Sequence, residues 1–136
     1  MTKLNDLIQN ARQIVFMTGA GVSTASGIPD YRSKNGLYSH GQTPEYLLSH
    51  DCLVNEPEVY YDFVIHNLFY PDAQPNIIHQ KMAALTREGR ATIITQNIDG
   101  LHAQADPAPG SLIEFHGNLY NIVCQYIIVK SFSALR

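Results

Sequence analysis

Tryptophan is absent from this chain of 136 residues, and cysteine occurs only at Cys52 and Cys124. Two cysteines so far apart predict no disulfide framework, and free thiols are expected in a reducing cytoplasm. Basic residues are also scarce, because nine Lys and Arg stand against twelve Asp and Glu, which gives a net charge of -3. Since a nucleic-acid backbone is bound by a basic surface, we expect no nucleic-acid partner.

Long hydrophobic runs are missing too. No apolar segment approaches the roughly 20 residues that a membrane-spanning helix needs, and the first residues lack the pattern of a signal peptide. We therefore expect no membrane partner and a cytoplasmic location. A hydrophobic content of 45% is typical of a globular protein, and the length favours a single domain.

The spacing of apolar residues predicts an α/β fold. Short apolar runs at residues 14–18 and 91–95 predict two strands, and a helical pattern at about 76–88 lies between them. Strand, helix and strand in this order predict a parallel pair in which both strands are buried. A helix at 4–12 and a third strand at 112–115 complete the pattern.

A stretch with frequent prolines separates the first strand from the central helix. We assign about residues 31–75 to a helical insertion, with short helices predicted at 45–50 and 58–68. The predicted fold class is therefore α/β, a partial Rossmann-like parallel sheet with a helical insertion.

The turn Gly19-Ala20-Gly21 directly follows the first predicted strand. Glycines at this place let the backbone approach a pyrophosphate, as in dinucleotide-binding proteins. The usual third glycine is replaced by Thr24, and no acidic ribose ligand follows about twenty residues later. The motif alone leaves a nucleotide site and an ordinary turn equally open.

Asp30, Tyr31 and Arg32 follow at the place to which a ligand bound at that turn would extend. A charged pair beside an aromatic ring could cover and orient a cofactor. The alternative is an Asp–Arg pair that closes a loop, with Tyr31 as half-buried packing.

Four residues after the second predicted strand, Gln96 to Asp99, lie where open α/β sheets place their ligands. Amide groups can bind ribose hydroxyls, and Asp99 can accept a hydrogen bond from a carboxamide. A helix N-cap is the alternative, since Asn and Asp are favoured there. His102, three residues beyond Asp99, is equally compatible with a helix surface or with a supporting role.

His116 follows the third predicted strand and precedes Gly117. Imidazole groups exchange protons near neutral pH, which suits a general base, although a histidine at a strand end is often structural. Cys124 is the only candidate metal ligand in this part of the chain. Because structural zinc sites use four ligands and no further cysteine follows, we expect no complete zinc site in this chain.

Five motifs, taken in order, resemble the sirtuin family of NAD-dependent protein deacylases, in its bacterial form, over about residues 1–124. They are Gly19–Ser23, Gly27–Ser33, Pro75–His79, Thr95–His102 and Phe115–Gly117. The resemblance implies that NAD is the cofactor and that the partner is an acetylated lysine of a protein substrate. It also implies an NAD site lined by Ala20, Gly21, Thr24, Asp30, Tyr31, Arg32, Gln96, Asn97, Ile98 and Asp99.

The implied reaction moves the acyl group from lysine to ADP-ribose and releases nicotinamide. By the resemblance, Ile98 and Asp99 hold the nicotinamide carboxamide, and His116 is the catalytic base that takes a proton from a ribose hydroxyl. The resemblance also implies that Asn97 and Asp99 are catalytic residues together with His116. Some family members that prefer acidic acyl chains carry a Tyr-x-x-Arg pair, whereas here Tyr61 is followed by Val64, so acetyl-lysine is the expected substrate.

The family pattern ends near Cys124. Sirtuins continue through a four-cysteine zinc module and several more strands, whereas residues 125–136 depart from that pattern. We therefore expect residues 1–136 to form an incomplete sirtuin-type catalytic domain, truncated or frameshifted, without the zinc module and the C-terminal half of the fold, and with weak or absent activity. Two alternatives stay open, a non-catalytic nucleotide-binding fragment and a mono-ADP-ribosyltransferase.

Overall fold

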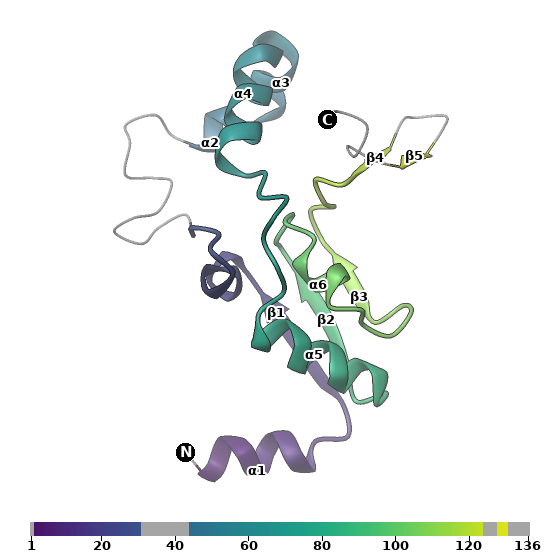
Figure 1. Ribbon diagram of the computed structural model, residues 1–136. Coiled ribbons are helices and arrows are strands. Elements are labelled where there is room, and N and C mark those ends of the chain that lie inside the picture. The colour runs from purple at the N-terminus through teal and green to yellow at the C-terminus, as the bar shows by residue number, and fades with distance from the viewer. Residues whose placement is uncertain (1, 31–43, 124–127, 131–136) are drawn as a thin grey trace.

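Three parallel strands form the central sheet of this chain, in the order β1-β2-β3 (Figure 1). They are β1 (Ile14–Thr18), β2 (Ala91–Thr95) and β3 (Leu112–Glu114). The structure is a computed structural model that describes residues 2–30, 44–123 and 128–130, with side chains described for 5–30 and 45–121. The predicted α/β class and the predicted parallel pairing are confirmed.

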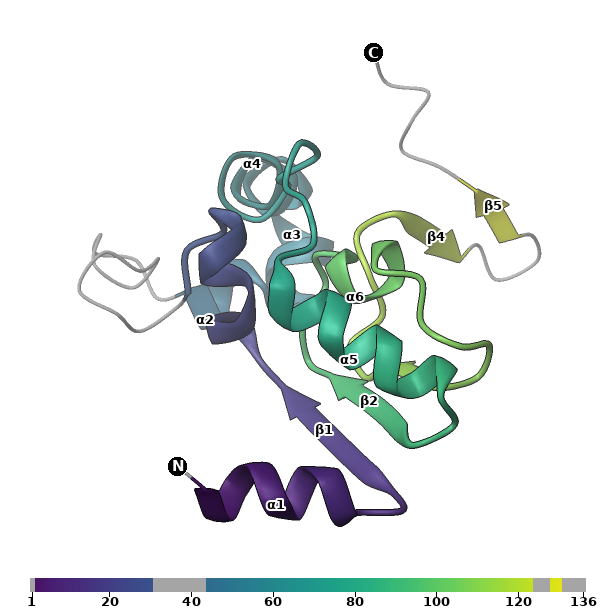
Figure 2. The same ribbon diagram turned by 60° about the horizontal axis from the view of Figure 1, so that its bottom comes forward.

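Helix α5 (Ile77–Arg87) connects the helical insertion to β2 and packs against that strand, with the short helix α6 (Leu101–Gln104) beside it (Figure 2). Its amphipathic pattern buries His79, Ala83 and Thr86. After it, Gly89 takes a positive φ of 70°, which lets the chain turn into the strand. The predicted helix at about 76–88 is thus confirmed.

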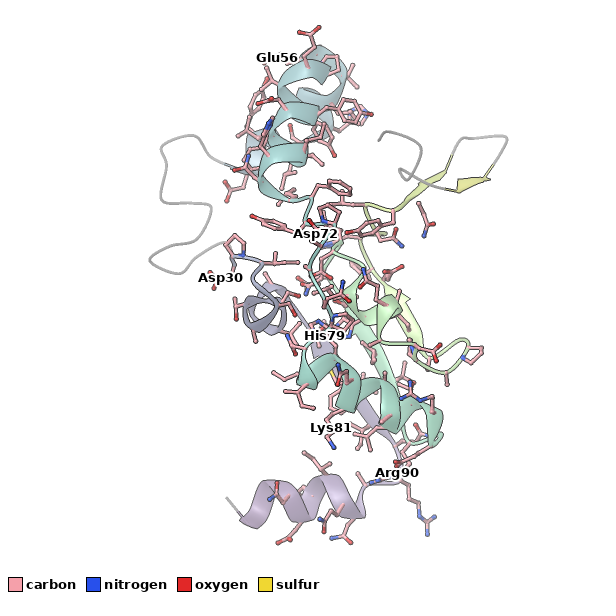
Figure 3. All side chains as sticks on the ribbon, in the orientation of Figure 1. Asp30, Glu56, Asp72, His79, Lys81 and Arg90 are labelled. Carbon is pink, nitrogen blue, oxygen red and sulfur yellow. The ribbon has the colours of Figure 1, made fainter. Side chains whose placement is uncertain are left out.

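Helix α1 (Thr2–Asn10) precedes β1 and is tied to the far end of the sheet by Arg90 (Figure 3). The Arg90 guanidinium donates to the carbonyl oxygens of Ile8 and Ala11 at 2.7 and 3.2 Å. These carbonyls lie where a helix leaves its last acceptors unpaired, so the arginine caps α1 from the start of β2.

The helical insertion contains α2 (Pro44–Leu47), α3 (His50–Asn55) and α4 (Pro57–Asn67), which pack on one another away from the sheet (Figure 1). Helix α3 was not predicted. The Ser49 hydroxyl caps it by accepting from the Cys52 amide at 3.1 Å, and Pro57 begins α4 directly after it.

The two faces of the sheet differ in burial. Ile93 is 0% exposed on the face that α5 covers, whereas Val15 and Met17 on the other face are 65% and 73% exposed. The prediction that both strands are buried is therefore wrong for one face of β1. Helix α5, which packs on β2, and its neighbour α6 lie over the opposite face (Figure 2), and the period-two alternation of a strand turns Val15 and Met17 away from them.

An antiparallel pair follows the sheet, formed by β4 (Asn121–Val123) and β5 (Ile128–Lys130). No helix within the described ranges 2–30 and 44–123 has both the length and the apolar character that crossing a membrane requires.

Candidate functional site

The carboxyl ends of the three strands bring the predicted polar segments to one edge of the sheet. Thr18 lies opposite Thr95, and Thr95 lies opposite Glu114. Beyond these residues the pairing continues, because the Gln96 amide donates to the Thr18 carbonyl at 3.1 Å and the Phe115 amide donates to the Thr95 carbonyl at 2.9 Å. Segments that are distant in sequence therefore begin side by side, where open α/β sheets bind ligands.

Asn97 ties the segment after β2 to the turn after β1. Its buried side-chain amide donates to the Gly19 carbonyl at 3.2 Å and to the Ser23 hydroxyl oxygen at 3.1 Å. Its backbone amide donates to the Thr95 hydroxyl at 3.0 Å. The structure thus shows Asn97 ordering the glycine turn, and the contact with a ribose that the resemblance implies stays a prediction.

Asp99 uses both carboxylate oxygens. Oδ2 accepts from the Ser23 hydroxyl at 2.6 Å, and Oδ1 accepts from the Leu101 amide at the start of α6 at 3.0 Å. The residue therefore supports a helix start, as the N-cap alternative holds, and also joins the polar cluster. Each carboxylate oxygen has more than one lone pair, so Asp99 retains the capacity to accept from a ligand.

Ser23 is the centre of this cluster, although the predicted site did not include it. It is 0% exposed and lies in the 3-10 helix η1 (Ala20–Ser26). Its hydroxyl accepts from Asn97 and donates to Asp99, which joins the amide to the carboxylate. A hydroxyl two residues after the glycine turn was the available signal in the sequence.

Asn76 holds η1 from the other side. Its side-chain amide donates to the Val22 carbonyl at 2.8 Å and to the Ser26 hydroxyl at 2.9 Å. Its side-chain oxygen accepts from the Ile78 amide, and the Asn76 backbone amide donates to His79 Nδ1 at 3.3 Å. The His79 ring thus accepts from a backbone amide at the start of its own helix.

His79, which lies in the first turn of α5 (Figure 3), forms a buried pair with His102 of α6. They are 0% and 1% exposed, with ring centroids 4.7 Å apart. His102 Nε2 lies 2.9 Å from the Thr18 hydroxyl, whereas His79 Nε2 and His102 Nδ1 have no hydrogen-bond partner within the described part of the chain. The interpretation of His102 as a helix-surface residue is therefore wrong.

Burial lowers the pKa of both imidazoles. For His102 burial and the neighbouring His79 lower the pKa to about 4, while the charge of Asp99 acts in the opposite direction. For His79 burial again dominates, and Asp99 again opposes it. Both rings are therefore neutral at pH 7, which suits a pair that packs edge to face.

His116 contrasts with this buried pair, because it is exposed just beyond β3. Its Nδ1 lies 3.1 Å from the Gln96 carbonyl oxygen. A carbonyl can only accept, so Nδ1 donates there, and Nε2 is the nitrogen of the neutral ring that can take up a proton. The hydrogen bond thus selects the tautomer that a general base at this place needs.

The remaining predicted cofactor residues have different surroundings. Gly21 and Thr24 are exposed in η1, and the Thr24 hydroxyl donates to the Gly21 carbonyl at 2.9 Å. A Cβ built on Gly19 or Gly21 would meet no atom within 4 Å, so this turn presents open backbone. Gln96 is exposed, and the other described members, Ala20, Asp30 and Ile98, are half-buried.

Tyr31, Arg32 and Cys124 lie outside the described residues. Cys52 is a buried free thiol in α3. Where the structure describes side chains, no group of three or more His, Cys, Asp and Glu residues could hold a metal ion.

The site combines an open glycine turn, an amide and carboxylate cluster and an exposed imidazole at the carboxyl edge of a parallel sheet. A three-stranded parallel sheet with polar segments at its carboxyl edge defines an α/β protein of the Rossmann-like class. The Sir2 family model matches residues 19–131, and the chain belongs to the Sir2 family.

Two curated relatives are each named as an NAD-dependent protein deacetylase. An NAD-dependent protein deacetylase of Listeria monocytogenes serotype 4b (strain F2365) is 59% identical over 125 residues, which are 92% of this chain and 54% of that protein. An NAD-dependent protein deacetylase of Lactiplantibacillus plantarum is 60% identical over 124 residues, or 91% of this chain and 52% of the relative. The chain thus spans about half the length of the curated relatives it matches.

Solved structures share the fold. A mutant Sir2 homologue in complex with ADP ribose superposes with a TM-score of 0.81 at 34% identity, over 95% of this chain and 51% of that one. A Sir2 structure with a deacetylated peptide and 3′-O-acetyl ADP ribose gives a TM-score of 0.79 at 36% identity. The match covers 93% of this chain and 50% of that one. Both are complexes of Sir2 proteins with ADP-ribose or an acetylated derivative of it.

Proposed function

We propose that this chain carries the NAD-binding and base-bearing part of an NAD-dependent protein lysine deacetylase. The observation that carries the proposal is the meeting of the Ser23–Asn97–Asp99 cluster with His116 at one edge of the sheet. The names of the relatives, which are NAD-dependent protein deacetylases, support the same activity. The proposed location is the cytoplasm.

The residues present fit NAD. The open backbone at Gly19 and Gly21 admits a phosphate group close to the chain, since no atom fills the space beside either residue. Gln96 is exposed at the same edge and offers an amide to ribose hydroxyls. Ile98 and Asp99 provide an apolar side chain and a carboxylate for the nicotinamide carboxamide. Asp30, Tyr31 and Arg32 belong to the proposed site as well.

In this reaction NAD supplies the ADP-ribose that accepts the acetyl group, with nicotinamide as the leaving group. The chain's contribution is mainly positioning, which accounts for a site built from amides and turns instead of strong acids. Asn97 fixes the glycine turn, Asp99 orients the carboxamide and His116 Nε2 accepts a proton from a ribose hydroxyl. The proposed substrate is an acetylated lysine of a protein.

A deacetylation assay with an acetyl-lysine peptide and NAD tests the proposal. We expect weak turnover, with free lysine and nicotinamide released in equal amounts, and we expect His116→Ala to lower that rate by about 10²- to 10⁴-fold, the usual contribution of a general base. NAD affinity of that variant should stay the same, because the imidazole lies outside the cluster. Turnover that is unchanged in His116→Ala would contradict the assigned base.

Two other outcomes identify the alternatives. NAD binding by calorimetry without nicotinamide release would indicate a nucleotide-binding module that does not catalyse. Transfer of label from NAD onto protein, without loss of acetyl groups from the peptide, would indicate mono-ADP-ribosyl transfer.

A further inference from the structure

Tyr120 lies in the turn after β3, outside every motif that the sequence analysis singled out. Its ring lies against Gly100, so close that a Cβ on Gly100 would come within 2.9 Å of two ring carbons. Gly100 has a positive φ of 71° and is the N-cap of α6. The ring therefore covers the residue that directly follows Asp99.

The turn that carries Tyr120 is fixed at both sides. The Leu119 amide donates to the Ile98 carbonyl at 3.0 Å, which links this turn to the segment after β2. The Tyr120 amide donates to the Asn118 side-chain oxygen at 2.9 Å, and the Asn118 side-chain amide donates to Glu114 Oε2 at 2.6 Å, at the end of β3. The ring thus rests on Gly100 from an anchored backbone.

Phe69 contacts the same ring from the segment that follows α4. The two ring centroids are 5.8 Å apart with a tilt of 44°, a distance at which aromatic pairs attract. Tyr120 therefore lies between the exit of the helical insertion and the turn that bears Asp99. Burial, together with the negative charge of Asp99, raises the pKa of the Tyr120 hydroxyl, which agrees with this closeness.

We propose that Tyr120 is a positioning residue for the nicotinamide side of the NAD site, because its ring holds the Ile98–Asp99–Gly100 turn in place. The assignment of the nicotinamide rests on the proposed function, whereas the support of the turn does not. A glycine at a turn gives the backbone wide conformational freedom. A ring packed on it removes that freedom before the ligand arrives, and such preorganisation strengthens binding.

Amide hydrogen exchange without ligand tests the support of the turn. In Tyr120→Leu we expect the amides of Leu101 and Leu119 to exchange about tenfold faster, the upper range for an aromatic contact. The β2 amide of Ile93, which donates to the Ser111 carbonyl, is the internal control and should not change. Tyr120→Phe keeps the ring and should match the unsubstituted chain. Unchanged exchange at Leu101 and Leu119, or equal acceleration at Ile93, would overturn the proposal.

Calorimetry with two ligands then tests the nicotinamide side. In Tyr120→Leu we expect NAD to bind about tenfold more weakly, while ADP-ribose, which lacks nicotinamide, changes by less than about twofold. Phe69→Leu should produce a smaller loss in the same direction. An equal loss for both ligands would overturn the nicotinamide assignment. Failure of the unsubstituted chain to bind NAD would refute the proposed function and this assignment together, and the exchange pattern would still decide whether Tyr120 holds the turn.

Discussion

The polar cluster and His116 occupy the same edge of the sheet but are held in opposite ways. Within the cluster, Ser23 is 0% exposed and Asn97 is 9% exposed. Asn97 donates to the Gly19 carbonyl and to the Ser23 hydroxyl, and Ser23 donates to Asp99. His116 is exposed and is held through one ring nitrogen, which donates to the Gln96 carbonyl.

This difference separates two tasks. Groups that orient a ligand have to be fixed before binding, because ordering them afterwards reduces affinity. A proton acceptor has to present one nitrogen in the correct tautomer, and a single hydrogen bond at Nδ1 is sufficient for that. Substitutions in the cluster should therefore change binding and stability together, whereas substitutions of His116 should change turnover alone.

The largest effect on stability is expected from Asp99→Ala. The variant removes the acceptor of the buried Ser23 hydroxyl and of the Leu101 amide. Leaving such donors without a partner should lower the free energy of unfolding by about 3 kcal/mol in urea titrations. Asp99→Asn keeps one oxygen acceptor and should lose less. A loss below about 0.5 kcal/mol for Asp99→Ala, the range of ordinary surface substitutions, would show that the cluster is not held as described.

Acid pH should weaken the fold through the buried pair of His79 and His102. The folded-state pKa of His102 is about 4, below its ordinary value of 6.5. Between these two pH values the imidazole is protonated in the unfolded chain but neutral in the folded chain. The free energy of unfolding should therefore fall between pH 6.5 and 4, by about 2–3 kcal/mol from His102, and be fully retained above 6.5.

Urea titrations across that pH range, on the unsubstituted chain and on His102→Gln, measure this effect. Glutamine carries no titrating group yet can still reach the Thr18 hydroxyl. The slope of the unfolding free energy against pH should be smaller in the variant. Identical slopes in the two proteins would contradict a neutral buried His102.

Gly100→Ala should lower the free energy of unfolding by less than Asp99→Ala does. A side chain on a residue in the left-handed conformation costs about 1–2 kcal/mol, and its Cβ would also clash with the Tyr120 ring. Gly110→Ala is the matched control, because Gly110 also has a positive φ, 77°, and a Cβ there would meet no atom within 4 Å. Thermal or urea unfolding of both variants isolates the ring contact. Equal losses would mean that the ring does not restrict the turn.

The smallest effect on stability is expected from His116→Ala. An exposed side chain with one hydrogen bond should contribute within about 0.5 kcal/mol to the free energy of unfolding. The same urea titration checks this value. A loss comparable with that of Asp99→Ala would remove the distinction between the two parts of the site.

Local sequence patterns were sufficient for the strands. The predicted ranges 14–18 and 91–95 match β1 and β2, because short apolar runs that end at turns specify strands locally. They were not sufficient for α3, whose only local signal is the cap at Ser49. The burial of Met17 was predicted wrongly, because the packing on the second face of a strand is not determined by the strand itself.

The contacts that join the supporting residues of the site had no local signal. Ser23 and Asp99 are 76 residues apart in sequence, and Thr18 and His102 are 84 apart. Each residue alone fits a turn or a helix, and only the parallel register brings them together. The motifs around Gln96 and His116 were found because polar groups directly after strands have a defined place in an α/β sheet.

Calorimetric titration of NAD into His116→Ala measures whether the Ser23–Asn97–Asp99 cluster binds the ligand without the base. We expect saturable binding with a dissociation constant within about twofold of the unsubstituted chain, a difference below about 0.5 kcal/mol. A dissociation constant at least tenfold weaker, or no saturable heat in either protein, would contradict it.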